Sequence, residues 1–342
     1  MTVIEFYKRF RHMLIPTVDQ IAELKDMNTL KTDLLAGLTV ALVLVPQSMA
    51  YAQLAGLPAY YGLYASFLPP MIAAIFGSSR QLATGPVAVV SLMTAAALEP
   101  LASSSAEGFL VYATLLAILV GLFQVSLGIL RLGVLVDFLS HPVVVGFTNA
   151  GAIIIATSQL SKLFGVQVEK AEHHYETVYN TLQAAASHLH WPTLLMSVFS
   201  IVLMIGLKRW RPTLPNVLIA VVVTTLISKF SGYAESGGAI VGDIPRGLPP
   251  ITFPQFELDA VLQLLTSAVV IALIGFMEAI SIAKAMAART RQRLDVNQEL
   301  VGQGLSNLVS GLTSGYSVSG SFSRSAVNMD AGAITGFSSI VT

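Results

Sequence analysis

The chain has 342 residues, of which 54% are hydrophobic and only 11% are charged, and its mean hydropathy is +0.72. Soluble domains carry about 25% charged residues, so this composition excludes a single soluble domain and indicates a membrane protein that crosses the bilayer several times. The net charge of zero gives no reason to expect a nucleic-acid partner, and the lack of cysteine excludes disulfides and cysteine metal sites.

A membrane helix needs about 20 apolar residues, and this rule predicts nine spans and the start of a tenth. Residues 1–32, which precede them, are amphipathic and lack a cleavable signal peptide, so we expect a cytoplasmic surface helix there. The tenth span begins near Phe322 and runs to the end of the chain. The third is too short to cross a bilayer alone. The nine predicted spans are residues 33–55, 59–77, 86–98, 108–130, 134–160, 191–208, 213–230, 260–284 and 296–312.

The placement of Lys and Arg gives the orientation of these spans. With the N-terminus inside, fourteen of the 19 Lys and Arg residues lie in inner segments and four lie in the outer loops, near residues 161–190 and 231–256. Positive charge is enriched on the cytoplasmic side of membrane proteins, so the N-terminus is predicted to be cytoplasmic. The remaining cation, Arg324, falls inside the apolar layer. The basic run Arg289–Arg293 is interpreted as an inner anchor near anionic lipid.

Two short polar stretches, Ala83–Pro86 and Ser317–Ser325, interrupt the apolar chain, and each precedes an apolar run. A broken helix inside a membrane is tolerated only where it is buried in protein or lines a cavity. A pair of breaks at matching places in two halves of a chain indicates a binding site at the middle of the bilayer. We therefore expect a half-helix to start at each break.

The two halves of the chain overlay with an offset of 231–235 residues. This offset places Pro46–Ala52 on Met277–Ala283 and brings the two polar breaks into register. Gln47 and Glu278, two polar residues in the middle of their spans, then occupy equivalent positions. The similarity is weak in identity but consistent in position, which indicates an internal repeat. A complete second half would add four more spans, so we expect the second repeat to be incomplete in this chain.

Two half-helix starts that face each other would form a trap for an anion. Each helix N-terminus offers free backbone N–H groups and about half a positive charge. Val87 and Ala88 would donate N–H groups from one side. Phe322 and Ser323 would donate from the other side, with the Ser323 hydroxyl as a further donor.

Other polar residues are candidates for the same pocket. Arg324 would add a full positive charge to the anion site or pair with Glu278. A carboxylate at the centre of a bilayer is costly unless it is paired or protonated. Glu278 is therefore a candidate proton site, or a sodium site together with Thr84 and freed carbonyl groups. Gln47 and Tyr51 are four residues apart, so they share a helix face and could line the pocket.

Each candidate also has a purely structural interpretation. Glu278 could be a static partner of Arg324, or Arg324 could extend along the helix to the membrane surface. Gln47 could make an interhelical hydrogen bond, and Tyr51 could simply pack. Ser323 could cap its half-helix, which is compatible with binding.

We recognise no catalytic or metal-binding constellation. Four histidines fall in an outer segment without a carboxylate or cysteine pattern, so they are interpreted as solvated surface. Gly302–Gly304 lacks a third glycine and a preceding strand, so it is not a nucleotide motif. We expect no enzymatic activity, no metal and no cofactor, with H⁺ or Na⁺ as a coupling ion. The four histidines are His173, His174, His188 and His190.

At these residues the chain resembles the SulP anion transporters, which are related to the prestin-type solute carriers. The resemblance runs from about residue 30 to the end of the chain, and its motifs are specific in combination. They are Leu44–Ala52, Ala55–Pro58, Gly62–Tyr64, Thr84–Ala88, Asp137–Ser140, Gly146–Phe147, Glu278–Ser281 and Gly320–Asn328.

The resemblance implies an all-α polytopic fold of two inverted seven-span repeats, with half-helices at spans 3 and 10. It implies a core domain, here residues 33–130 and 257–342, which moves against a gate domain, here residues 131–232, in elevator-type alternating access. Residues 1–32 would be a cytoplasmic segment, and residues 233–256 an extracytoplasmic loop. The chain lacks the last gate spans and the STAS domain that usually follows them, so it is expected to be a C-terminally truncated member.

The resemblance also implies a homodimer and an anion held between the starts of spans 3 and 10. It places five side chains near that anion, those of Gln47, Tyr51, Glu278, Ser323 and Arg324.

The favoured hypothesis is a secondary transporter of sulfate, bicarbonate or a dicarboxylate in a bacterial inner membrane. Glutamate rather than aspartate at position 278 favours proton coupling by analogy. The alternatives are an uncoupled exchanger or channel on the same fold, a Na⁺-coupled bicarbonate transporter, and a nucleobase carrier, whose pocket would favour paired acidic residues over Arg324. A membrane enzyme or regulatory scaffold is a further alternative, which would require a catalytic constellation.

Overall fold

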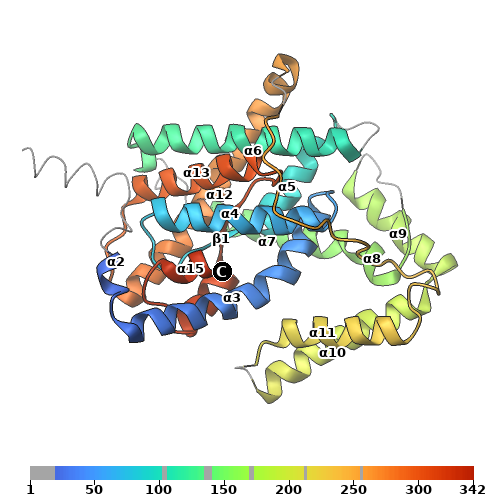
Figure 1. The fold of residues 1–342 in the computed structure, drawn as a ribbon. Coiled ribbons are helices and arrows are strands. Elements are labelled where there is room, and N and C mark those ends of the chain that lie inside the picture. Colours follow the sequence, from blue (N-terminus) through green and yellow to red (C-terminus); the bar gives the residue numbers. More distant parts are fainter. Residues whose placement is uncertain (1–19, 102–105, 135–140, 169–172, 212–213, 255–256) are drawn as a thin grey trace, which may run out of the picture. The chain divides into compact units, whose positions relative to one another are not determined.

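The computed structural model describes residues 20–101, 106–134, 141–168, 173–211, 214–254 and 257–342. The chain is predominantly helical and divides into two compact units, one formed by residues 1–140 and 245–342 and the other by residues 141–244. Figure 1 shows the helices and the short strands.

The first unit contains both strands and the helices that precede and follow each strand in the sequence. Its elements are α2 (Gln20–Glu23), α3 (Met27–Leu54), α4 (Tyr60–Phe76), β1 (Ala83–Gly85), α5 (Ala88–Leu98), α6 (Ala106–Ile129), α12 (Leu258–Thr290), α13 (Val296–Leu312), β2 (Ser319–Ser321), α14 (Phe322–Asp330) and α15 (Phe337–Val341). The second unit consists of α7 (His141–Ser158), α8 (Leu160–Phe164), α9 (His174–His188), α10 (Trp191–Trp210) and α11 (Asn216–Phe230).

The predicted spans correspond to helices, and four of these helices are long and apolar enough to cross a membrane. These four are α3, α6, α10 and α12. Helix α3 starts at Met27 rather than near residue 33, because the Asp26 carboxylate accepts hydrogen bonds from the N–H groups of Asn28 and Thr29 and so caps the helix. The third span is the eleven-residue half-helix α5.

The prediction that the tenth span runs unbroken to the end of the chain is wrong. Helix α14 stops at Asp330, and Gly332 then adopts the left-handed φ of +90° that ends many helices. The buried carboxylate of Asp33 on α3 accepts hydrogen bonds from the N–H groups of Ile334, at 2.7 Å, and Thr335. These bonds satisfy the connecting backbone before α15 begins.

The segment predicted as an outer loop at residues 161–190 contains two helices, α8 and α9. His190, predicted to be solvated surface, is half-buried and hydrogen-bonds Thr193 at 2.7 Å and the carbonyl of Ser236 at 2.9 Å. Residues 1–19, most of the expected surface helix, and residues 135–140, at the start of the fifth span, lie outside the described residues.

The internal repeat is visible in the element lengths. Helices α4 and α13 both contain 17 residues, and α12 begins 231 positions after α3. The two three-residue strands likewise occupy equivalent places: β2 directly precedes its half-helix, and β1 ends two residues before its own. These correspondences agree with an offset close to the one predicted from the sequence.

Helix α13 is the central element of the first unit, where it packs between α6 and α4 (Figure 1). Glycines permit this packing: a Cβ at Gly304 would lie 2.6 Å from the backbone N of Val125, and one at Gly121 would lie 2.7 Å from the carbonyl of Gly304. Small residues let helix backbones approach closely in membranes, where van der Waals packing replaces the hydrophobic effect as the main attraction.

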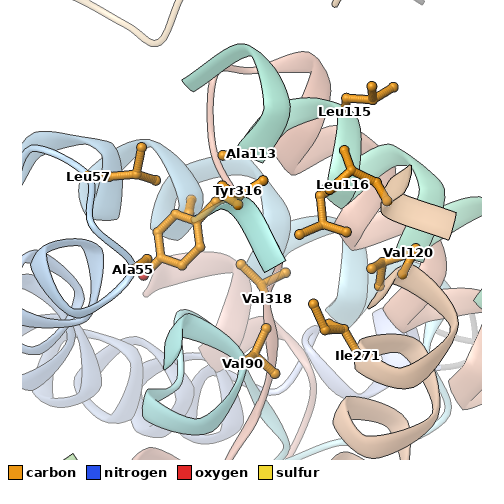
Figure 2. Close-up of a cluster of buried hydrophobic side chains, with 14 of the residues drawn as sticks. Ala55, Leu57, Val90, Ala113, Leu115, Leu116, Val120, Ile271, Tyr316 and Val318 are labelled. Atoms are coloured by element: carbon orange, nitrogen blue, oxygen red, sulfur yellow. The ribbon is translucent and has the colours of Figure 1, made fainter. Parts of the chain in front are cut away.

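A buried apolar cluster surrounds the segment that leads into β2. Tyr316 and Val318 pack there with Val90 of α5, Leu116 of α6 and Ile271 of α12 (Figure 2). Each of these side chains is at most 2% exposed. The cluster therefore holds the segment that leads into β2 in place.

Gly304→Ala should destabilise the first unit, because the added methyl group meets the backbone of α6. Overpacking of a tight core costs about 1–3 kcal/mol. The thermal unfolding midpoint of the purified protein in detergent measures the effect. Gly206→Ala in α10 is the matched control, since a Cβ there meets nothing within 4 Å in the part of the chain that is described. Equal midpoints for the two variants would contradict the predicted close packing of α13 and α6.

Candidate functional site

The two polar breaks meet as a short antiparallel ribbon. Strands β1 and β2 pair with Ala83 opposite Ser321, Thr84 opposite Gly320, and Gly85 opposite Ser319. Because the strands are antiparallel, α5 and α14 start from opposite ends of the ribbon, each with its N-terminus nearest to it. The ribbon satisfies backbone groups that would otherwise be unpaired in the apolar layer.

The two half-helices start differently. Val87 precedes α5 in an extended conformation and gives it no side-chain cap. The hydroxyl of Ser321 accepts a hydrogen bond from the backbone N–H of Arg324 at 3.4 Å and so caps α14. The expectation that Ser323 could act as the cap is therefore wrong. Ser323 is exposed, as is Phe322, with 63% of its surface accessible.

Arg324 is fully buried at the start of α14. Its Nη1 donates a hydrogen bond to Oε1 of Gln47 at 3.2 Å. Within the described structure, its Nε and Nη2 atoms have no hydrogen-bond partner. The alternative in which Arg324 extends to the membrane surface is therefore wrong. A guanidinium group offers five N–H donors, so most of its hydrogen-bonding capacity is free.

Glu278 on α12 lies within electrostatic range of Arg324 and Tyr51. No described residue, Arg324 included, makes a hydrogen bond to its buried Oε2 atom. Arg324 nevertheless acts on the Glu278 carboxylate through its charge, so the interpretation of Glu278 as a static partner of Arg324 stays a prediction. The carboxylate and the guanidinium therefore lie in one neighbourhood.

Helix α3 contributes Gln47 and Tyr51 to the same neighbourhood. Besides accepting from Arg324, the Gln47 amide donates to the hydroxyl of Ser323 at 3.5 Å. The interhelical hydrogen bond considered for Gln47 is thus present, and it connects Gln47 to the site itself. Tyr51 is partly exposed and interacts electrostatically with both Arg324 and Glu278. Side chains of three helices therefore converge beside the ribbon.

The remaining predicted residues lie on or next to β1. Gly85 faces Arg324, because a Cβ there would lie 3.2 Å from Nη2. Side chains alternate along a strand, so Thr84 points to the opposite face, where its hydroxyl accepts a hydrogen bond from Gln303 at 2.8 Å. The structure therefore does not bring the Thr84 side chain to Arg324. Val87 is buried and Ala88 is half-buried at the start of α5.

Sequence reasoning missed a second set of polar residues, on α13. Buried polar side chains recur there every three or four positions, a pattern that marks one helix face and was readable in the span 296–312. This face makes hydrogen bonds to β1 and to Val318, the residue directly before β2, and it does not include the predicted site residues. Its members are Glu299, Gln303, Ser306, Asn307 and Ser310.

The fold and the site define a class of protein: a polytopic membrane protein in which two half-helices meet around a buried cation. The chain belongs to the sulfate permease family, whose profile matches residues 30–342. This is a family of permeases and not of enzymes.

Curated relatives and solved structures agree with this assignment. The chain is 42% identical over 320 residues to the probable sulfate transporter 4.2 of Arabidopsis thaliana, covering 91% of this chain and 47% of the relative. It is 41% identical to a probable sulfate transporter of Mycobacterium tuberculosis, covering 87% of this chain and 53% of the relative. The chain thus spans about half the length of the curated relatives it matches.

Two solved structures have the same fold. The structure of SLC26A9 matches all of this chain with a TM-score of 0.92 at 24% identity, over 57% of its own length. The transmembrane domain of the cyanobacterial bicarbonate transporter BicA matches 92% of this chain with a TM-score of 0.81 at 28% identity, over 79% of its own length. The chain therefore has the helical transporter fold that the sequence predicted.

If the site binds an anion, Gly85→Ala should weaken the binding of sulfate by about tenfold, the equivalent of about 1.4 kcal/mol. The added methyl group would push against Arg324 Nη2, and the φ of +147° at Gly85 strains any other residue. Equilibrium binding of radiolabelled sulfate measures the change. Gly332→Ala is the control, because Gly332 also has a positive φ and a Cβ there would meet only Thr32. Equal affinities for both variants would exclude a role for the Gly85 contact.

Proposed function

We propose that this chain carries the anion site of a secondary transporter for a small anion. The observation that carries the proposal is the buried guanidinium of Arg324, whose Nε and Nη2 atoms have no partner among the described residues. An unpaired buried charge is strongly unfavourable, whereas a bound anion supplies both the opposite charge and the missing acceptors. A buried cation with free hydrogen-bond donors is therefore suited to binding an anion.

Backbone groups complete the proposed coordination. The first-turn N–H groups of α14, at Phe322 and Ser323, and the Ser323 hydroxyl donate from one side. The N–H groups of Val87 and Ala88 donate from the start of α5. The Gln47 amide, which is hydrogen-bonded to both Arg324 and Ser323, holds the guanidinium in place. The two helix dipoles and one full positive charge act on the same solute.

Sulfate is the first candidate substrate, and bicarbonate and a dicarboxylate belong to the same chemical class. The relatives from Arabidopsis thaliana and Mycobacterium tuberculosis are named as sulfate transporters, and BicA as a bicarbonate transporter. All three anions present several oxygen acceptors to a donor set of N–H and O–H groups, so the donors alone do not separate them.

Glu278 is the proposed coupling residue. Its carboxylate lies in the electrostatic field of Arg324 and has a buried oxygen atom without a partner in the described structure. Binding a proton would neutralise the carboxylate and remove part of the cost of keeping it in the apolar layer. A sodium ion at Glu278 is the alternative, and it would bind without help from the Thr84 side chain, which lies on the other face of the ribbon.

Alternating access is proposed to arise from movement of a core domain against a gate domain. The division of the chain into residues 1–140 with 245–342 and residues 141–244 supports this assignment, because each unit packs mainly within itself. Two compact units with an anion site inside one of them fit elevator-type transport. We further propose a homodimer in the inner membrane, with the N-terminus in the cytoplasm.

Arg324→Ala should weaken sulfate binding by at least about 100-fold, because a hydrogen bond to a charged group contributes about 1.5–3 kcal/mol and this residue offers several. Scintillation-proximity binding to the purified protein measures the affinity. Arg80→Ala is the matched control, since Arg80 instead forms an ion pair with Glu23 at 2.8 Å. Unchanged sulfate affinity in Arg324→Ala would remove Arg324 from the site.

Glu278→Gln should make uptake insensitive to a proton gradient, because glutamine is neutral and cannot exchange a proton. Uptake of radiolabelled sulfate into proteoliposomes, with and without an inward proton gradient, measures the coupling. The unsubstituted protein should accumulate more sulfate with the gradient. If a sodium gradient drives its uptake instead, the coupling ion is Na⁺. If neither gradient has an effect, the transporter is an uncoupled exchanger or channel.

A further inference from the structure

The polar face of α13 contacts the ribbon without reaching Arg324. Its residues recur every three or four positions and are buried, although α13 is a predicted membrane span. Polar groups at such a position are costly unless each is hydrogen-bonded. The partners of these hydrogen bonds therefore indicate the role of this helix face.

Asn307 is bonded to the chain directly before β2. Its Oδ1 accepts a hydrogen bond from the N–H of Val318 at 2.8 Å, and its Nδ2 donates to the carbonyl of Val318 at 3.0 Å. The side-chain amide thus pairs with the Val318 backbone as a residue of a neighbouring strand would. Nδ2 also donates to Oε1 of Gln124 at 3.0 Å, and Gln124 in turn donates to the carbonyl of Ala272. The residue directly before β2 is therefore tied to α6 and α12 through two side chains, those of Asn307 and Gln124.

Gln303 holds the other strand. Its Nε2 donates to the Thr84 hydroxyl at 2.8 Å and to Oε1 of Glu299 at 3.1 Å. The second oxygen of Glu299 accepts the N–H groups of Ser78 and Ser79, both at 2.8 Å. The Gln303 amide therefore uses its nitrogen for both contacts, and its Oε1 atom has no partner among the described residues. Strand β1 is therefore attached to α13 one turn away from the point that holds β2.

We propose that Asn307 and Gln303 are positioning residues of the anion site. Residues four apart on a helix are neighbours, so the two amides hold the two strands to adjacent turns of one rigid element. Strand β2 leads directly into α14, and β1 leads into α5 through Pro86 and Val87. The first N–H groups of the two half-helices and Arg324 surround the proposed anion. A site of this kind must be held within about 0.5 Å of its productive geometry. The inference rests on the proposed function, because it assigns these residues a role in anion affinity.

Asn307→Ala should weaken sulfate binding by about tenfold, equivalent to about 1.4 kcal/mol, although the residue does not touch the anion. Ser306→Ala is the matched control: Ser306 is the adjacent buried residue, and its hydroxyl donates to the carbonyl of Pro69 on α4 instead of to the ribbon. The affinity of the Ser306→Ala variant for sulfate should lie within about twofold of that of the unsubstituted protein. Thermal unfolding midpoints of both variants show whether they lose comparable stability.

A double-mutant cycle tests the other attachment and serves if Asn307→Ala fails to fold. Gln303→Leu and Thr84→Val each remove the same hydrogen bond, so their losses of sulfate affinity should not add in the double variant. A role in stability alone would lower the unfolding midpoint and leave the dissociation constant unchanged. In transport, a positioning role raises KM for sulfate more than it lowers the maximal rate.

The outcomes separate this inference from the proposed function. If Arg324→Ala loses sulfate binding while Asn307→Ala and Gln303→Leu bind normally, the positioning role is overturned and the anion site stands. An equal loss of affinity in Ser306→Ala, or additive losses in the cycle, also overturns the positioning role. Normal sulfate binding by Arg324→Ala overturns both proposals.

Discussion

The constraint that organises this structure is the need to pair every backbone polar group in an apolar layer. Two helices stop inside that layer, and the freed groups on either side of each break are paired by a three-residue antiparallel ribbon. The pairing of Ala83 with Ser321 and of Gly85 with Ser319 is what brings two segments over 200 residues apart to one place. The start of each half-helix, and with it a set of free N–H donors, follows from that ribbon.

The ribbon creates the electrostatic environment in which Arg324 can be buried. Gly85 leaves space beside Nη2, and the Gln47 amide supplies one acceptor, which is less than the guanidinium can bind. Glu278 lowers the cost of the positive charge through the field it exerts, without a direct ion pair. Both groups are costly to keep in an apolar layer unless they are paired, and the proposed anion and coupling ion would supply partners for them. The buried Arg324 guanidinium thus lowers the stability of the folded protein while it favours the binding of an anion.

Much of the fold was predictable because the membrane makes length and hydropathy decisive. The apolar runs predicted α3, α4, α6 and α12, and the polar breaks predicted both half-helices. The strands were not predictable, since Ala83–Gly85 and Ser319–Ser321 consist of small residues with little strand preference. The break after Asp330 was missed because the Asp33 carboxylate, which pairs the backbone groups freed there, comes from the other end of the sequence.

The sequence by itself determined the kinds of group available: a cation, a carboxylate and two helix starts inside an apolar chain, with a repeat that relates them. Only the tertiary structure decided which of them meet. It joined Gln47 to Arg324 and Ser323, turned Thr84 towards Gln303, and replaced Ser323 by Ser321 as the cap of α14. Composition and periodicity are local properties of the chain, whereas the face on which a strand residue points depends on pairing with a distant partner.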